Sequence, residues 1–240
     1  MWLRRHGLFV AEGRLLALRL LEHWPSSILS ILVSPGAKTA VAGKVPPAVP
    51  VYVADTSIVH AVTGINFHRG CLALGRRPQP VEPAALASAQ RLIALEGIAN
   101  PDNLGGIFRV AAAFGVDGIV LDPTTADPLY RKSLRTSMGA VFAVPFTRLY
   151  EWPLALTKLA GFKIVAMTTR VQAVPLAMFA QASDTPTIVM FGSESSGLSD
   201  IPFELADHEV TIPMAPGVDS LNVVVAAGIA LSWLRDRAGG

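Results

Sequence analysis

Residues 91–235 alternate short apolar segments with segments of helical pattern, and this alternation restricts the possible folds more than any other feature of the sequence. The segments predicted as strands are residues 92–95, 118–121, 141–144, 163–167, 187–191 and 210–212. Helices are predicted over residues 104–114, 131–138, 154–160 and 221–235. Strands that alternate with helices over short loops predict an α/β fold, with a mostly parallel sheet flanked by helices on both faces. Such sheets bind ligands beyond the carboxyl ends of their strands.

A proline-rich segment divides the chain into two units. Residues 76–83 contain three prolines and charges of both signs, which can continue neither a helix nor a central strand. We therefore expect a small α/β domain over residues 1–77, a linker over residues 78–89 and a larger domain over residues 90–240. In the small domain, the predicted strands are residues 8–10, 28–33, 51–53 and 71–74, and the predicted helices are residues 14–23 and 56–62.

Composition excludes several classes of protein. Hydrophobic residues make up 51% of the chain, which predicts a large core, but no uncharged apolar run reaches the roughly 20 residues of a membrane span. With charges also interrupting the N-terminal apolar region, we expect a soluble, cytoplasmic protein. The single cysteine, Cys71, lies in an apolar stretch and is predicted to be buried, and the histidines show no metal-ligand spacing. The net charge of +2 is compatible with a nucleic-acid partner.

Three loops at predicted carboxyl ends of strands combine glycine with polar residues. The first, residues 100–109, contains Asn103 as the expected helix cap, two glycines and Arg109. The second, residues 191–198, lacks the spacing of a phosphate loop and of a serine-hydrolase elbow. The third, residues 212–223, leads into the last helix with Ser220 as its expected cap. Each loop taken alone is equally well explained as a helix cap or a tight polar turn.

Taken together and in this order, the three loops resemble the sequence motifs of the SpoU-like (SPOUT) RNA methyltransferases. They match the patterns N-x-G-x-x-x-R at residues 103–109, F-G-x-E-x-x-G-L at residues 191–198 and I-P-M…S-L-N-V at residues 212–223. The basic stretch of residues 130–140 is also similar to that family. The resemblance covers about residues 90–235, and residues 8–75 more loosely resemble the substrate-binding domain that often precedes it. Only Ser195 and Val224 depart from the common residues.

This resemblance implies a fold, a cofactor and a set of site residues. It implies a sheet whose C-terminal segment forms a trefoil knot, a homodimer, and S-adenosylmethionine as cofactor. The cofactor would be held by Gly192, Ile212, Met214 and Leu221. The catalytic centre would consist of Asn103, Arg109, Glu194, Ser220 and Asn222.

The expected reaction is methyl transfer to a ribose 2′-hydroxyl of structured RNA. Because a guanidinium does not readily lose its proton, we expect Arg109 to hold an RNA phosphate and stabilise the developing alkoxide rather than to act as a base. Glu194 and Asn103 would orient Arg109. The N-terminal domain favours ribosomal RNA over transfer RNA as the substrate.

Two other functions fit parts of the pattern. A dinucleotide-binding oxidoreductase shares the alternation of strands and helices but should carry G-x-G-x-x-G after its first strand, where this chain has only Gly105 and Gly106. A transfer-RNA 2′-O-methyltransferase or a non-catalytic RNA-binding relative would share the three motifs.

Overall fold

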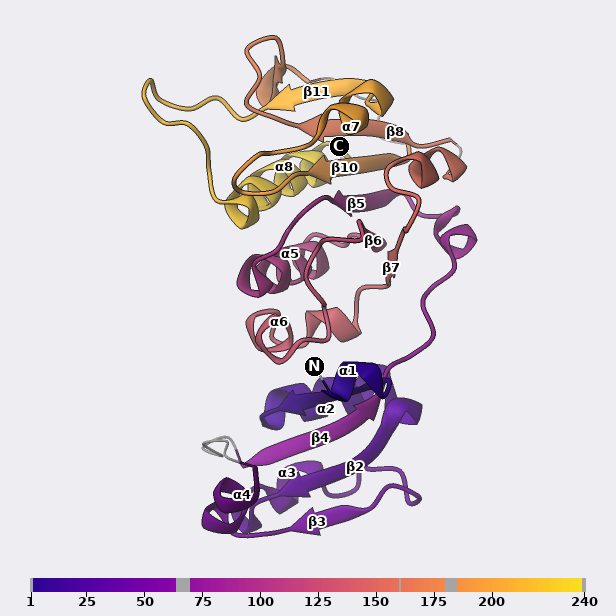
Figure 1. Ribbon diagram of the computed structural model, residues 1–240, viewed down its shortest axis with the longest axis vertical. Coiled ribbons are helices and arrows are strands. Elements are labelled where there is room, and N and C mark those ends of the chain that lie inside the picture. The colour runs from indigo at the N-terminus through magenta and orange to yellow at the C-terminus, as the bar shows by residue number, and fades with distance from the viewer. Residues whose placement is uncertain (1, 64–69, 160, 180–184, 239–240) are drawn as a thin grey trace.

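A computed structural model describes residues 2–63, 70–159, 161–179 and 185–238, which form two separate sheets (Figure 1). The larger sheet has the strand order β7-β6-β5-β10-β8-β11-β9, and every neighbouring pair in it is parallel. Its strands are β5 (Arg91–Leu95), β6 (Gly118–Leu121), β7 (Phe146–Arg148), β8 (Lys163–Met167), β9 (Val174–Pro175), β10 (Thr187–Phe191) and β11 (His208–Thr211). All residues of β6 and β10 are buried, as expected for apolar strands covered on both faces.

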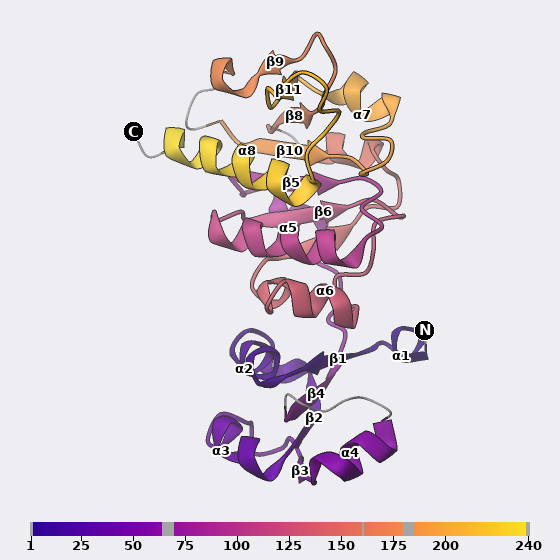
Figure 2. The same cartoon turned by 90° about the vertical axis from the view of Figure 1, so that its left-hand side faces the viewer.

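The α-helices that accompany the larger sheet are α5 (Pro101–Ala113), α6 (Arg131–Thr136), α7 (Asp200–Leu205) and α8 (Val223–Ala238). Figure 2 shows α5 and α8 side by side on one face of the sheet, with α6 beyond α5. The two glycines of the first motif are what allow this close packing. A Cβ at Gly105 would lie 2.5 Å from the carbonyl oxygen of Ser133 on α6, and one at Gly106 would lie 2.8 Å from a methyl group of Val224 on α8. These glycines therefore serve helix packing.

The smaller sheet has the order β1-β4-β2-β3. Its strands are β1 (Leu8–Glu12), β2 (Ile28–Val33), β3 (Val51–Val53) and β4 (Cys71–Arg76). The helices of this unit are α1 (Trp2–Arg5), α2 (Arg14–His23), α3 (Lys38–Val41) and α4 (Thr56–Thr63). Cys71 is fully buried, and its burial raises the pKa of the thiol to about 11, as suits a side chain that acts as a small apolar group.

The two sheets share one continuous apolar core. Phe9 of the smaller sheet and Trp24, which follows α2, make ring contacts with Phe142, and Trp24 also contacts Phe146 on β7. The Arg131 guanidinium on α6 pairs with Glu12 on β1 at 2.6 Å. The two units are thus joined by buried side chains as well as by the chain between them.

The predicted elements are mostly confirmed, with instructive exceptions. Residues 141–144 were expected as a strand but lie at a 3-10 helix (Ala140–Phe142). Of the α-helix expected over residues 154–160, Leu154–Lys158 form a 3-10 helix, and residue 160 lies outside the described residues. The predicted linker is partly structured, since Pro83–Leu86 forms a 3-10 turn that buries Leu86 under the larger sheet. The edge strands β7 and β9 and the helix α7 escaped prediction because they are too short to show a clear period.

The mostly parallel α/β sheet flanked by helices is as the sequence predicted. Within the described residues, no helix has both the length and the apolar character needed to cross a membrane.

Candidate functional site

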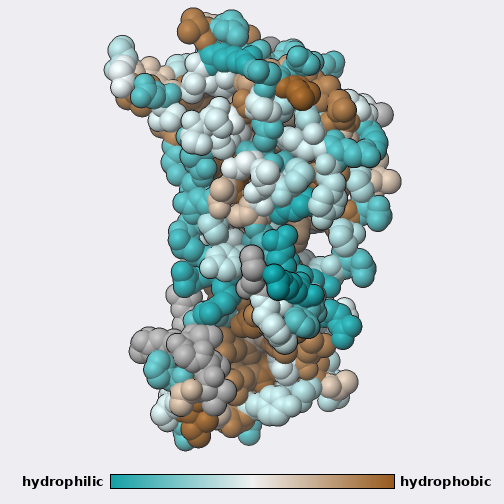
Figure 3. Space-filling view, in the orientation of Figure 1, coloured by the Kyte–Doolittle hydropathy of each residue, from teal (hydrophilic) through white to brown (hydrophobic). Residues whose placement is uncertain are grey.

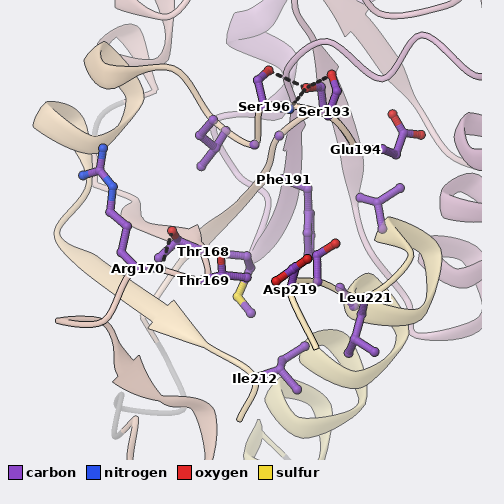
Figure 4. A pocket seen from close by; sticks show the side chains of 18 of the residues that line it. Thr168, Thr169, Arg170, Phe191, Ser193, Glu194, Ser196, Ile212, Asp219 and Leu221 are labelled. Carbon is purple, nitrogen blue, oxygen red and sulfur yellow. Dashed lines mark hydrogen bonds between the residues drawn. The ribbon is translucent and has the colours of Figure 1, made fainter. Parts of the chain in front are cut away.

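A cavity of about 560 Å³ opens at the carboxyl ends of β8, β10 and β11 (Figure 4). Its walls come from the end of β8, the loop after β10, α7 and the segment between β11 and α8. The residues that line it include Met167, Thr168, Thr169, Arg170, Phe191, Gly192, Ser193, Glu194, Phe203, Ile212, Met214, Asp219, Ser220 and Leu221. All four predicted cofactor-binding residues, together with the predicted catalytic Glu194 and Ser220, therefore line one cavity.

The loop after β10 is a compact hairpin-like turn. Ser193 and Gly197 exchange backbone hydrogen bonds of 3.0 and 2.9 Å, and the Ser193 hydroxyl lies 2.7 Å from that of Ser196. A Cβ at Gly192 would lie 2.0 Å from the carbonyl carbon of Gly197 and 2.1 Å from the nitrogen of Leu198. Glycine at position 192 is thus required by the backbone of its own loop, which the sequence pattern alone did not reveal.

A chain of hydrogen bonds ties the three motifs together at the edge of this cavity. The Asn103 amide nitrogen donates to Glu194 Oε1, and the Asn222 amide nitrogen donates to Asn103 Oδ1 at 3.1 Å. Asn222 Oδ1 in turn accepts from the backbone nitrogen of Val224 at 2.9 Å. Both ends of the Asn103 amide are engaged, so its orientation is fixed, and it fixes one oxygen of the Glu194 carboxylate.

The two helices that carry these asparagines begin differently from the sequence prediction. The N-cap of α5 is Asn100, whose side chain accepts from the nitrogen of Asp102 at 2.9 Å, and not Asn103. At α8 the capping side chain is that of Asn222, and not that of Ser220. Because neither Asn103 nor Ser220 serves as a cap, both side chains are left for other contacts.

Arg109 lies apart from this network. Six residues along a helix correspond to about 9 Å of rise and about 240° of rotation, so Arg109 and Asn103 occupy different faces of α5. Arg109 shares the face of Asp102, is exposed, and makes no hydrogen bond or ion pair with the part of the chain that the structure describes. The expected contact of Glu194 or Asn103 with Arg109 is not present within one chain.

Asp102 joins the first turn of α5 to α6. Its carboxylate pairs with Lys132 at 2.7 Å and accepts from the Thr136 hydroxyl at 2.9 Å. The hydrogen bond from Lys132 and then that from Thr136 hold the pKa of Asp102 below its usual value. Part of the basic stretch of residues 130–140 thus serves to fasten α6 to α5.

One wall of the cavity, the segment that follows β8, was not predicted from the sequence. Thr168, Thr169 and Arg170 follow β8, and the Arg170 guanidinium lies 3.4 Å from the centre of the Phe203 ring on α7. Arg170 also pairs with Asp200 at 3.4 Å and with Glu209 at 3.6 Å. Because β8 lies next to β10, a prediction of strand order would have indicated this wall.

The charges that line the cavity are mostly negative. Arg170 stands against three carboxylates, those of Glu194, Asp200 and Asp219. Such a cavity favours a ligand that carries positive charge.

Comparison with known proteins identifies a family and several relatives of this chain. Residues 90–232 match the sequence model of the SpoU rRNA Methylase family. Over 194 residues the chain is 39% identical to a protein of Mycobacterium tuberculosis described as an uncharacterized tRNA/rRNA methyltransferase, and the match covers 79% of this chain and 67% of the relative. A protein of Synechocystis with the same description is 41% identical over 143 residues, or 60% of this chain and 52% of that protein.

Solved structures share the whole fold. A putative RNA methyltransferase of the TrmH family from Porphyromonas gingivalis aligns with a TM-score of 0.85 and 26% identity, over 98% of this chain and 92% of that chain. An AdoMet-bound rRNA methyltransferase from Sinorhizobium meliloti aligns with a TM-score of 0.82 and 26% identity, over 97% of this chain and 88% of that chain. The likeness extends across both sheets.

Proposed function

The chain belongs to the SpoU rRNA methylase family and is an RNA methyltransferase, and we propose that it transfers a methyl group from S-adenosylmethionine to a ribose 2′-hydroxyl of structured RNA. The observation that carries the proposal is the Glu194–Asn103–Asn222 network, which places one residue from each motif at the edge of a cavity. Family membership also implies that the segment from β11 to α8 closes a trefoil knot.

The cavity suits the proposed cofactor in size and charge. Its volume of about 560 Å³ lies within the range of small-molecule sites. S-adenosylmethionine, when bound, supplies a methyl group on a positively charged sulfonium, and three carboxylates against one guanidinium favour such a cation. Gly192, Ile212, Met214 and Leu221 would hold it, with apolar side chains around the adenine. The AdoMet-bound relative from Sinorhizobium meliloti supports S-adenosylmethionine as the cofactor.

The catalytic residues divide into an orienting group and a clamp. Asn103 and Asn222 fix the Glu194 carboxylate, and its second oxygen would accept a hydrogen bond, and then the proton, from the ribose hydroxyl. Ser220, freed from the capping role, would contact the same hydroxyl. Holding the hydroxyl in line with the transferred methyl group supplies much of the acceleration.

Arg109 is proposed as the clamp for an RNA phosphate. Its exposed position on α5, without a partner among the described residues, leaves its five N–H donors to a ligand that arrives from solvent. A phosphate held there would fix the substrate nucleotide relative to Glu194.

We also propose that the enzyme is a homodimer that acts on ribosomal RNA. Val225 and Ile229, four residues apart on α8, are 50% and 39% exposed and form an apolar stripe. Light scattering should give twice the chain mass at micromolar concentration, and a Val225→Glu/Ile229→Glu variant should be monomeric. A wild-type protein that scatters as a monomer would contradict the dimer.

The proposed reaction is tested by the position of the methyl group. We would incubate the protein with methyl-labelled S-adenosylmethionine and total RNA, digest the RNA and identify the labelled nucleoside by mass spectrometry. A 2′-O-methylnucleoside that arises from ribosomal RNA is the expected product. A methylated base would contradict the ribose assignment, and label confined to transfer RNA would replace ribosomal RNA as the substrate.

A further inference from the structure

A second hollow, which we call the junction groove, lies where the two sheets meet. It has a volume of about 470 Å³ and is formed by α1, the segment that follows β4, the loop after β6 and the strand β7 with its flanks. The residues that line it include Arg4, Trp24, Arg77, Pro78, Gln79, Leu121, Asp127, Phe142, Phe146, Arg148 and Tyr150. None of them belongs to the three motifs.

The charges of the junction groove are mostly positive. Three arginines, Arg4, Arg77 and Arg148, line it together with one carboxylate, that of Asp127. The Arg77 guanidinium donates to both carboxylate oxygens of Asp127 and neutralises most of its charge. The Nε atom of Arg4 lies 3.9 Å from Asp127 Oδ2. The Arg4 side chain is 66% exposed and is thus accessible to an anion.

Arg148 is held rigidly at the floor of the groove. Its guanidinium donates to the carbonyl oxygens of Asp122 and of Ala126, the second at 3.0 Å, and these are neutral acceptors. Burial lowers the pKa of Arg148, a sign that its charge is only partly compensated by its surroundings. Additional negative charge in the groove would stabilise it.

An aromatic ring stands free at the edge of the groove. The Tyr150 side chain is 81% exposed and follows β7 by two residues. Trp24, by contrast, is fixed in the wall by ring contacts with Phe142 and Phe146. Exposed aromatic rings beside cationic side chains are the usual platform on which unpaired bases stack.

The groove shares a side of the molecule with the cavity. Arg148 ends β7 and Phe191 ends β10, and both strands run parallel in one sheet, so both sites lie at its carboxyl edge. Figure 2 shows α1, which carries Arg4, on the side of the molecule at which α8 begins. Figure 3 shows hydrophilic residues gathered around α1, between the two sheets.

We propose that the junction groove binds an unpaired nucleotide of the substrate RNA, at a point away from the reacting ribose. Arg4 receives a phosphate, Arg148 supplies fixed positive charge, and Tyr150 stacks on the base. The proposal rests on the proposed function only in taking RNA as the ligand. RNA would then be recognised by the junction groove between the two units, and not by the smaller sheet alone.

The test measures binding of RNA by the full chain. The probe is a fluorescently labelled 12-nucleotide single-stranded RNA of mixed sequence, followed by anisotropy at fixed salt. Tyr150→Ala should weaken binding about 5- to 100-fold, because a stacked base is lost. Tyr150→Phe keeps the ring and should bind as the wild type does. Equal binding by the wild type and Tyr150→Ala would overturn the proposal, as would equal losses in Tyr150→Ala and Tyr150→Phe.

The charge is tested by Arg4→Ala with a matched control. Loss of one phosphate contact should lower the slope of log affinity against log salt by roughly 0.7. Lys163→Ala removes an exposed cation at the amino end of β8, on the opposite edge of the sheet, and should leave both the affinity and the slope unchanged. An unchanged slope in Arg4→Ala, or an equal change in Lys163→Ala, would overturn the role of Arg4.

Two further measurements separate this inference from the proposed function. A 12-base-pair RNA duplex should bind almost equally to the wild type and to Tyr150→Ala, because bases inside a duplex are already stacked between their neighbours. A Tyr150→Ala defect on the duplex as large as that on the single strand would overturn stacking. Calorimetry should show wild-type affinity of Tyr150→Ala for S-adenosylmethionine, and loss of that affinity would mean that the variant acts through the fold. If wild-type protein methylates no ribose, the proposed function fails, whereas the anisotropy result still decides the groove.

Discussion

The two hollows at the carboxyl edge of the larger sheet are opposite in charge. The cavity beside β8 and β10 has three carboxylates against one arginine, and the junction groove beside β7 has three arginines against one carboxylate. The first composition attracts a cationic small molecule and repels phosphate, and the second attracts phosphate. One edge of one sheet therefore offers separate places to a cationic ligand and to a polyanion, with β5 and β6 between them.

The largest effect is expected at Arg109, the residue proposed to hold an RNA phosphate close to the negative cavity. Arg109→Ala should lower the rate of methyl transfer about 10²-fold, because without the phosphate clamp the ribose hydroxyl is no longer held in a reactive position. Its affinity for S-adenosylmethionine should stay within a few-fold of wild type, because Arg109 does not line the cavity. Single-turnover assays measure the rate of methyl transfer, and calorimetry measures the affinity for S-adenosylmethionine. Near-normal turnover would show that RNA phosphate approaches the cavity without this residue.

The second effect concerns the shape of the cavity. In Gly192→Ala the new Cβ meets the backbone of Gly197 at 2.0 Å, so the loop that carries Glu194 must move. We expect the affinity for S-adenosylmethionine to fall by about 100-fold or more, since about 3 kcal/mol of lost contacts corresponds to that ratio. Gly36→Ala, where a Cβ would meet nothing within 4 Å, is the matched control. Calorimetry with circular dichroism decides, and wild-type affinity in a folded Gly192→Ala protein would place the cofactor elsewhere.

Much of the cavity could be predicted from the sequence, but very little of the junction groove. The bounds of Thr187–Phe191 and the residues that follow it were predictable because a fully buried strand leaves a clear apolar run. The loops at its carboxyl end then fell into recognisable motifs. The groove, by contrast, is built by Arg4, Arg77 and Arg148, which are far apart in the chain and belong to no periodic pattern.

The two wrongly predicted helix caps have one physical origin. Asn103 and Ser220 were predicted as caps because each precedes an apolar helical segment, yet the helices begin at Pro101 and Val223. Helix ends are set by which side chain reaches the free backbone N–H groups, and this depends on contacts across the fold such as that between Asn222 and Asn103.

The third effect concerns β6, one of the two strands between the hollows. Asp122 follows β6, is almost fully buried, and accepts from the Thr125 nitrogen at 2.6 Å and from the Thr124 hydroxyl. Burial opposes its ionisation, but the hydrogen bonds from Thr124 and Thr125 outweigh burial and lower the pKa. Asp122→Asn should therefore reduce the free energy of unfolding by about 1–3 kcal/mol at neutral pH.

The pH dependence of the difference in stability between Asp122→Asn and wild type follows from the direction of the pKa shift of Asp122. Because the pKa is lower in the folded state, the carboxylate contributes stability above the ordinary value of 3.8 and loses it as the pH falls through the folded value. Urea denaturation at pH 7 and near pH 3 should show a smaller difference between Asp122→Asn and wild type at the lower pH. A difference that grows on acidification would contradict the shift.

The smallest effect on stability, and the finest test of the cavity, is expected at Asn222. Its Oδ1 caps α8 and its amide nitrogen orients Asn103, so one side chain serves both the fold and the site. Asn222→Ser keeps a good capping residue and removes the donor to Asn103, because the serine side chain is too short to reach it. The free energy of unfolding should change by no more than about 0.5 kcal/mol, whereas turnover should fall about tenfold, since each 1.4 kcal/mol of lost orientation corresponds to that factor. Asn222→Ala loses both roles and should also cost about 1 kcal/mol of stability. Turnover that falls only in Asn222→Ala, in step with stability, would mean that the network holds the helix and does not orient Glu194.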